Sequence, residues 1–98
     1  MSEDIDTDLE ALYALIERRQ TELPADSYTT SLLTHEKGAN RALEKLGEEA
    51  VETVLAAKDG DPEALTAEAV DLIYHLWVVL AMHDVDMAAL REELDSRN

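Results

Sequence analysis

The chain has 98 residues, enough for one domain and too few for two, so we expect a single domain over residues 1–98. Its 23 acidic and 8 basic residues give a net charge of −15, which argues against a nucleic-acid-binding surface. The chain has no cysteine, so disulfides and thiolate metal sites are excluded. The acidic start is no signal peptide, and the longest apolar run, 76–82, is far shorter than the roughly 20 residues of a membrane helix. We therefore expect a cytoplasmic protein with no membrane or nucleic-acid partner.

The predicted elements are all helices, because no strand-like alternation of apolar and polar residues occurs along the chain. The first helix is expected at about 7–20, where leucine and isoleucine recur at helical spacing, with Asp6 or Thr7 as its N-cap. A short helical segment is expected at about 28–33, with Ser27 as its N-cap.

Two long helices and a short one are expected next. The first of them, about 40–58, has an apolar stripe opposite its charged residues: Leu43, Leu46, Gly47, Ala50, Val54 and Ala57. The next runs from an Asp61 cap to about His83 and is apolar nearly all round over 72–82, so it should lie at the centre of a bundle. The last is expected at about 86–96. The fold class is thus an all-α bundle of four to five helices, and so short a chain gains from pairing with a second copy as a dimer.

Acidic side chains are paired at helical spacing on both long helices. Glu49 and Glu52 are three residues apart with Glu48 beside them, and Glu68 and Asp71 are three apart on the next helix. If the two edges face each other, four or five carboxylates converge and repel, and a divalent cation relieves this. All-oxygen ligands suit Mg²⁺ or Mn²⁺ and do not suit zinc or copper. The alternative is that these acids form a solvated helix face.

Other side chains near these acids allow two interpretations each. Arg41 and Lys45 are either ion-pair partners of neighbouring glutamates or cations that hold phosphates. His75 is either a ligand or a core histidine with one satisfied hydrogen bond. Tyr74 and Trp77 either pack in the core or stack on a base.

The sequence around the acid pairs indicates one family more specifically than the pairs alone. Over about residues 9–96, the chain resembles the phosphoribosyl-ATP pyrophosphohydrolases, within the all-α nucleoside-triphosphate pyrophosphohydrolases. The resemblance is carried by a glycine at 38 and by the strings SYTTSLL (27–33), EKLGEEAVETVLAAK (44–58), EAVDLIYHLWVVLA (68–81) and VDMAALREEL (85–94). It implies hydrolysis of phosphoribosyl-ATP to phosphoribosyl-AMP and pyrophosphate, the second step of histidine biosynthesis. It also implies a need for Mg²⁺ and a helical homodimer.

The resemblance also implies roles for the acids. Glu49, Glu52, Glu68 and Asp71 fall on the metal-ligand positions of the family. Glu48 is the extra acid beside them, either as a ligand or as the group that orients the attacking water.

A second group of residues is predicted to bind the substrate. Lys45 matches a lysine of the family that is a candidate phosphate contact, and Arg41, Tyr74 and His75 are further candidates because they lie near the acids. Residues 27–29, Tyr74 and His75 match motif positions to which the resemblance gives no role. Two other functions remain open: a house-cleaning pyrophosphohydrolase acting on another nucleoside triphosphate, and a non-enzymatic acidic module for helical dimerisation.

The charge balance also bears on the source of the chain. Aspartate is abundant, and only three of the eight basic residues are lysines. Such a balance is typical of a salt-rich cytoplasm, where ions screen the self-repulsion of an acidic chain. We therefore expect a halophilic source, with an ordinary acidic protein as the alternative.

Overall fold

The computed structural model describes residues 5–98, which form five helices and no strand. In chain order they are α1 (Ile5–Glu22), α2 (Tyr28–Leu33), α3 (Ala39–Asp59), α4 (Pro62–Met82) and α5 (Met87–Arg97). The all-α prediction is confirmed, and so are the predicted caps Ser27 and Asp61, whose side chains accept hydrogen bonds from backbone N–H groups two or three residues on. The predicted caps of the first helix are wrong, because Asp6 and Thr7 lie inside α1.

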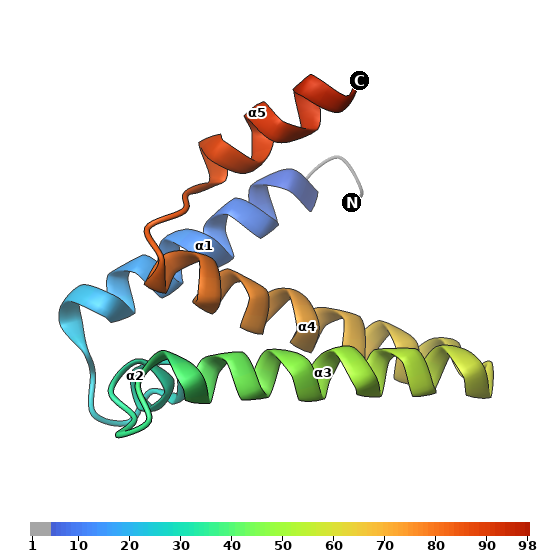
Figure 1. Ribbon diagram of the computed structural model, residues 1–98, viewed down its shortest axis with the longest axis horizontal. Coiled ribbons are helices and arrows are strands. Elements are labelled where there is room, and N and C mark those ends of the chain that lie inside the picture. Colours follow the sequence, from blue (N-terminus) through green and yellow to red (C-terminus); the bar gives the residue numbers. More distant parts are fainter. Residues whose placement is uncertain (1–4) are drawn as a thin grey trace.

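The helices are arranged around a long antiparallel pair. Figure 1 shows α3 and α4 packed side by side along their lengths, with α1 across the C-terminal half of α4 and α5 beyond α1. The short α2 lies beside the start of α3. The far end of the α3–α4 pair projects past α1, so in the described chain only one half of the pair is covered by other helices.

The turn between α3 and α4 is short and closely determined by its residues. Gly60 adopts the left-handed conformation, φ 69° and ψ 29°, which glycine reaches without a Cβ penalty. The Asp61 carboxylate then accepts the N–H groups of Glu63 and Ala64, both at 3.1 Å, and so caps α4. Pro62 occupies the first helical position, where its missing N–H is no loss. This turn sets the register of α4 against α3.

The core lies where α1, α2 and α4 meet the start of α3. Ile16, Leu32 and Val78 are its most deeply buried large side chains. The remaining buried members of the cluster are Tyr13, Ala42, Trp77 and Ala81. Trp77 is also held by its indole N–H, which donates to the carbonyl oxygen of Leu9 at 2.9 Å. Of the two interpretations of this tryptophan, the structure supports packing.

The long helix α4 is the central helix of the fold. Its length and its mean hydropathy of 1.5 would by themselves allow it to cross a membrane, although its longest apolar run is short. In the fold it packs against both α1 and α3 and supplies Trp77, Val78 and Ala81 to the core. It also bears the acidic residues Glu68 and Asp71 near its middle, so one face of this otherwise apolar helix is charged.

The outer side of α3 differs from the sequence prediction. The buried residues of this helix are seven apart, namely Ala42, Glu49 and Ala56, so α3 contributes only one narrow seam to the interior. The predicted apolar stripe does not face the core. Several large apolar side chains on this helix are exposed to about half their area or more: Leu43, Val51, Val54 and Leu55. The reason is that α4 occupies the centre and α3 packs on one side of it.

Candidate metal centre

Three carboxylates from the two long helices converge on one point. Glu49 of α3 and Glu68 and Asp71 of α4 each offer one oxygen, and these oxygens all lie within 4.8 Å of one another. The α3–α4 turn makes this possible, because it brings the middle of one helix opposite the middle of the other. The alternative of a purely solvated face therefore does not hold for Glu49, which is buried in the seam.

Glu49 is the most perturbed acid of the cluster. Glu49 is only 7% exposed, and its Oε2 has no hydrogen-bond partner among the described residues. The pKa of this carboxyl is raised from 4.5 to about 7, first by burial and then by the nearby carboxylates of Glu52, Glu68 and Asp71. A buried and unpaired carboxylate facing other acids is the arrangement that a hard cation stabilises.

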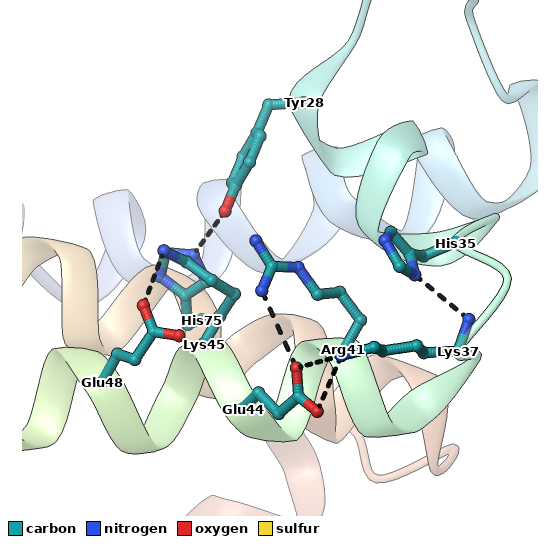
Figure 2. Close-up of polar contacts among 8 residues, drawn as sticks. All are labelled: Tyr28, His35, Lys37, Arg41, Glu44, Lys45, Glu48 and His75. Carbon is teal, nitrogen blue, oxygen red and sulfur yellow. Dashed lines mark hydrogen bonds and ion pairs between the residues drawn. The ribbon is translucent and has the colours of Figure 1, made fainter.

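The other two predicted acids lie at the edge of this cluster. Glu52, one turn from Glu49 on the exposed side of α3, is near enough to raise the pKa of Glu49 but is not one of the three convergent residues. Glu48 is turned toward a cation, since its Oε1 lies 3.3 Å from the Nζ of Lys45 (Figure 2). The structure thus groups three of the four predicted ligands closely and leaves Glu52 and Glu48 beside them.

His75 is a buried histidine with both ring nitrogens engaged. Its Nδ1 lies 2.7 Å from the carbonyl oxygen of Asp71, and its Nε2 lies 3.1 Å from the hydroxyl of Tyr28. Because a carbonyl oxygen only accepts, Nδ1 carries the proton and donates, and Nε2 accepts from the Tyr28 hydroxyl. Of the two interpretations of His75, this geometry supports a core histidine with satisfied hydrogen bonds, and it leaves neither nitrogen free for a metal or a substrate.

Tyr74 lies between this histidine and α2. Its hydroxyl is hydrogen-bonded to the Thr29 hydroxyl, and its ring meets the ring of His75 edge-on at 5.0 Å. Burial raises the pKa of the Tyr74 phenol, while the positive charge of Arg19 lowers it. Thr29 and Tyr28 were not predicted to act here, and their separation from Tyr74 and His75 by more than 40 residues gave no sign of these contacts. The only available signal was their place in the string SYTTSLL.

The two predicted phosphate-binding cations stand on α3, one turn apart. Figure 2 shows both side chains rising from α3 on the side where Tyr28 lies. Lys45 pairs with Glu48 at 3.3 Å, which raises the pKa of the lysine, and Arg41 lies 3.8 Å from Glu44. The ion-pair interpretation is therefore realised in the structure. Ion pairs of this kind are weak at a surface, so they can be exchanged for stronger contacts with phosphate.

The carboxylate cluster faces an open surface of the chain. Three cavities lie away from the cluster, one of them of about 340 Å³ lined by α1 and the start of α5. Glu49 is buried, Glu68 is half-buried and Asp71 is exposed, so the cluster is open to solvent on the side of Asp71.

Comparison with known proteins identifies the family. A family model described as phosphoribosyl-ATP pyrophosphohydrolase matches residues 9–98. A phosphoribosyl-ATP pyrophosphatase of Haloquadratum walsbyi is 63% identical over 86 residues, which cover 88% of this chain and 86% of that protein. Another, of Haloarcula marismortui, is 54% identical over 97 residues and covers 99% of both chains. A third, of the bacterium Roseobacter denitrificans, is 49% identical over 89 residues, or 91% of this chain and 83% of its own length.

These relatives also bear on the charge of the chain. The first two of these relatives come from halophilic archaea, in agreement with the net charge of −15. The matched region includes the convergent acids and every helix that positions them. The chain belongs to the phosphoribosyl-ATP pyrophosphohydrolase family.

Proposed function

We propose that this chain hydrolyses phosphoribosyl-ATP to phosphoribosyl-AMP and pyrophosphate, the second step of histidine biosynthesis, in the cytoplasm. The convergence of Glu49, Glu68 and Asp71 is the observation that carries the proposal. The names of relatives that cover nearly the whole chain favour this substrate over other nucleoside triphosphates. Burying an unpaired carboxylate within an acid cluster costs free energy of folding. This cost speaks against a non-enzymatic dimerisation module, because dimerisation does not require a buried carboxylate.

The donor set fits a divalent cation, and Mg²⁺ with Mn²⁺ as a substitute is the proposed cofactor. Glu49, Glu68 and Asp71 would hold it with oxygen ligands only, and Glu52 stands one turn away as the fourth predicted ligand. The orphaned Oε2 of Glu49 supports this assignment, because it needs a positively charged partner. Mg²⁺ held there would neutralise the triphosphate and lower the pKa of a bound water.

The remaining polar residues have roles around the phosphates. Lys45 and Arg41 release their weak ion pairs with glutamates and bind phosphate oxygens. Glu48, freed from Lys45, orients the attacking water and accepts its proton. The water oxygen attacks the α-phosphorus, the bond from that phosphorus to the bridging oxygen breaks, and pyrophosphate leaves. Tyr74 and the buried His75 fix the position of α2 beside this site through their hydrogen bonds with Thr29 and Tyr28.

A homodimer is part of the proposal. Val51, Val54 and Leu55 are exposed and share one face of α3 by their three- and four-residue spacing, and Val70 is a further exposed apolar residue on α4. An exposed apolar helix face of this kind marks an interface more often than it marks free solvent. A second copy packed there would bury these side chains and bring protein close to the open side of the acid cluster.

The test of the site uses isosteric substitutions. Asp71→Asn and Glu68→Gln remove one negative oxygen each, and we expect at least about a 100-fold loss of pyrophosphate release at saturating Mg²⁺, since a lost metal ligand costs several kcal/mol. Glu92→Gln, an exposed glutamate on α5, is the matched control and should keep full activity. Near-normal turnover by both site variants would refute the assignment.

The substrate is tested separately with the wild-type enzyme. Phosphoribosyl-ATP is compared with ATP, dUTP and other nucleoside triphosphates at equal Mg²⁺. A house-cleaning enzyme would show its highest kcat/KM on one of the others, whereas we expect phosphoribosyl-ATP to be preferred.

A further inference from the structure

One aromatic side chain is exposed beside the proposed site. The chain has four aromatic residues: Tyr13 and Trp77 are buried in the core and Tyr74 is half-buried, while Tyr28 on α2 is 50% exposed. It lies outside the buried core cluster and is the most exposed of the four aromatic side chains. The question is what its open side contacts.

Tyr28 is held in one orientation despite its exposure. Its hydroxyl donates to Nε2 of His75 at 3.1 Å, and its ring meets the His75 ring edge-on at 5.8 Å. The ring also stacks against Tyr74, with centroids 6.0 Å apart and planes inclined by 28°. His75 is itself buried and anchored to the backbone of Asp71. Contacts from α4 therefore fix one side of the Tyr28 ring, and the other side remains open.

The position of this ring relates to the proposed metal site. His75 follows Asp71 by four residues, or about 6 Å along the axis of α4. Figure 2 shows Tyr28 reaching from α2 toward His75, with Arg41 and Lys45 rising from α3 on the same side. The ring thus lies about one helical turn from Asp71 along α4, beside the cations proposed to hold phosphates. In a nucleotide, one ribose separates the phosphates from the base, which is a comparable interval.

We propose that the open side of the Tyr28 ring is the surface on which the purine base of the substrate stacks. The inference rests on the proposed placement of the triphosphate at the acid cluster and adds the group that receives the other end of the nucleotide. A rigid aromatic surface loses little freedom when a base stacks on it, and such stacking tightens binding about 5- to 150-fold. The hydroxyl has a separate task, because its bond to His75 sets the plane of the ring.

The experiment separates the ring from its hydroxyl. Tyr28→Leu removes the aromatic surface, Tyr28→Phe removes only the hydroxyl, and Tyr28→Trp enlarges the surface. Leu94→Ala on α5, which alters another exposed apolar side chain, is the control. For each protein, binding of two ligands is measured by calorimetry with Mg²⁺: phosphoribosyl-AMP, which contains the base, and inorganic tripolyphosphate, which does not.

We expect Tyr28→Leu to weaken phosphoribosyl-AMP binding about 5- to 150-fold and to raise the KM for phosphoribosyl-ATP by a similar factor. Its tripolyphosphate affinity should stay within about twofold. The Phe variant should keep most of the affinity for phosphoribosyl-AMP, the Trp variant should bind it at least as tightly as wild type, and Leu94→Ala should keep all of it. Circular dichroism and melting curves check that α2 remains folded; if the Leu variant is unfolded, the Trp variant still tests the idea, because a larger ring should bind at least as tightly.

Three results would overturn the proposal. Equal losses in the Leu and Phe variants would show that the hydroxyl acts only as a tether of α2. Unchanged affinity in the Leu variant would show that the base lies elsewhere, and an equal loss of tripolyphosphate would show that the residue acts on the phosphates. The proposed triphosphate site fails in a distinguishable way, since tripolyphosphate would then bind wild type and Asp71→Asn equally well.

Discussion

The perturbed carboxyl of Glu49 makes a quantitative prediction about stability without metal. The pKa of Glu49 is raised from 4.5 to about 7 in the folded chain. Its charged form is therefore less favourable in the folded chain than in the unfolded chain. The folded state then holds a proton that the unfolded state has lost, so stability falls as pH rises from about 4.5 to about 7 and stays low above that. At pH 8 the full shift corresponds to about 3 kcal/mol. Because water at the open side of the cluster screens part of the repulsion, we expect about 1–2 kcal/mol.

The perturbation is Glu49→Gln, which keeps the shape and removes the charge. Without metal, the variant should be about 1–2 kcal/mol more stable than wild type at pH 8 and no more stable at pH 5, where Glu49 is protonated in the fold. Mg²⁺ should reverse the order at pH 8, since only the wild type gains the binding free energy, about 2.7 kcal/mol at one hundred times Kd.

The assay is urea unfolding at pH 5 and pH 8, in EDTA and in Mg²⁺, at one fixed potassium chloride concentration. The quantity compared is the difference between variant and wild type, so the pH dependence of the other acids cancels. Glu92→Gln serves as the control and should show no such difference. A Glu49→Gln variant that is no more stable than wild type at pH 8 in EDTA would refute the reasoning that this carboxylate is strained by its neighbours.

Three further predictions follow from the fold. Raising potassium chloride from 0.1 M to 2 M should raise the melting temperature by several degrees, because the screening length falls from about 10 Å to below 3 Å and the net charge is −15; a melting temperature that does not rise would contradict salt adaptation. Val54→Glu places a charge on the exposed apolar face of α3, so it should shift the protein toward monomer in sedimentation experiments and lower its activity. Glu92→Gln should change neither the oligomeric state nor the activity. A monomeric wild type would exclude the proposed interface. Ile16→Ala should lower the free energy of unfolding by about 2–5 kcal/mol in urea titrations, because Ile16 is fully buried; a loss below about 1 kcal/mol would mean that the core is looser than the structure shows.

The sequence was informative where local spacing determines the structure. The Asp61 cap and Gly60 mark the junction of α3 and α4, and both behave as their residue types require. The three-residue spacing of Glu68 and Asp71 put both on one face of α4, and the structure places Glu49 opposite them. These features depend on the 3.6-residue period, which a single chain reveals directly.

The remaining features depend on packing between distant segments. The spacing predicted an apolar stripe through Val54, but periodicity alone cannot tell whether such a stripe faces the core or a surface of the chain. Glu48 is adjacent to Glu49 in the sequence and was predicted to act with it, but its side chain points to Lys45, with which it forms an ion pair. The bond between Tyr28 and His75 spans 47 residues and exists only because α2 docks on α4, which no local pattern encodes.

The two-residue junction at Gly60 and Asp61 has a consequence for how this chain can change its length. One residue inserted between Asp61 and Glu68 would rotate Glu68 and Asp71 by about 100° around α4 and take them off the seam that holds Glu49. The two helices can therefore grow or shrink together only by about one turn each, or roughly seven residues in total. The number of residues that separate the acids of α3 from those of α4 is thus as much a part of the site as the acids themselves.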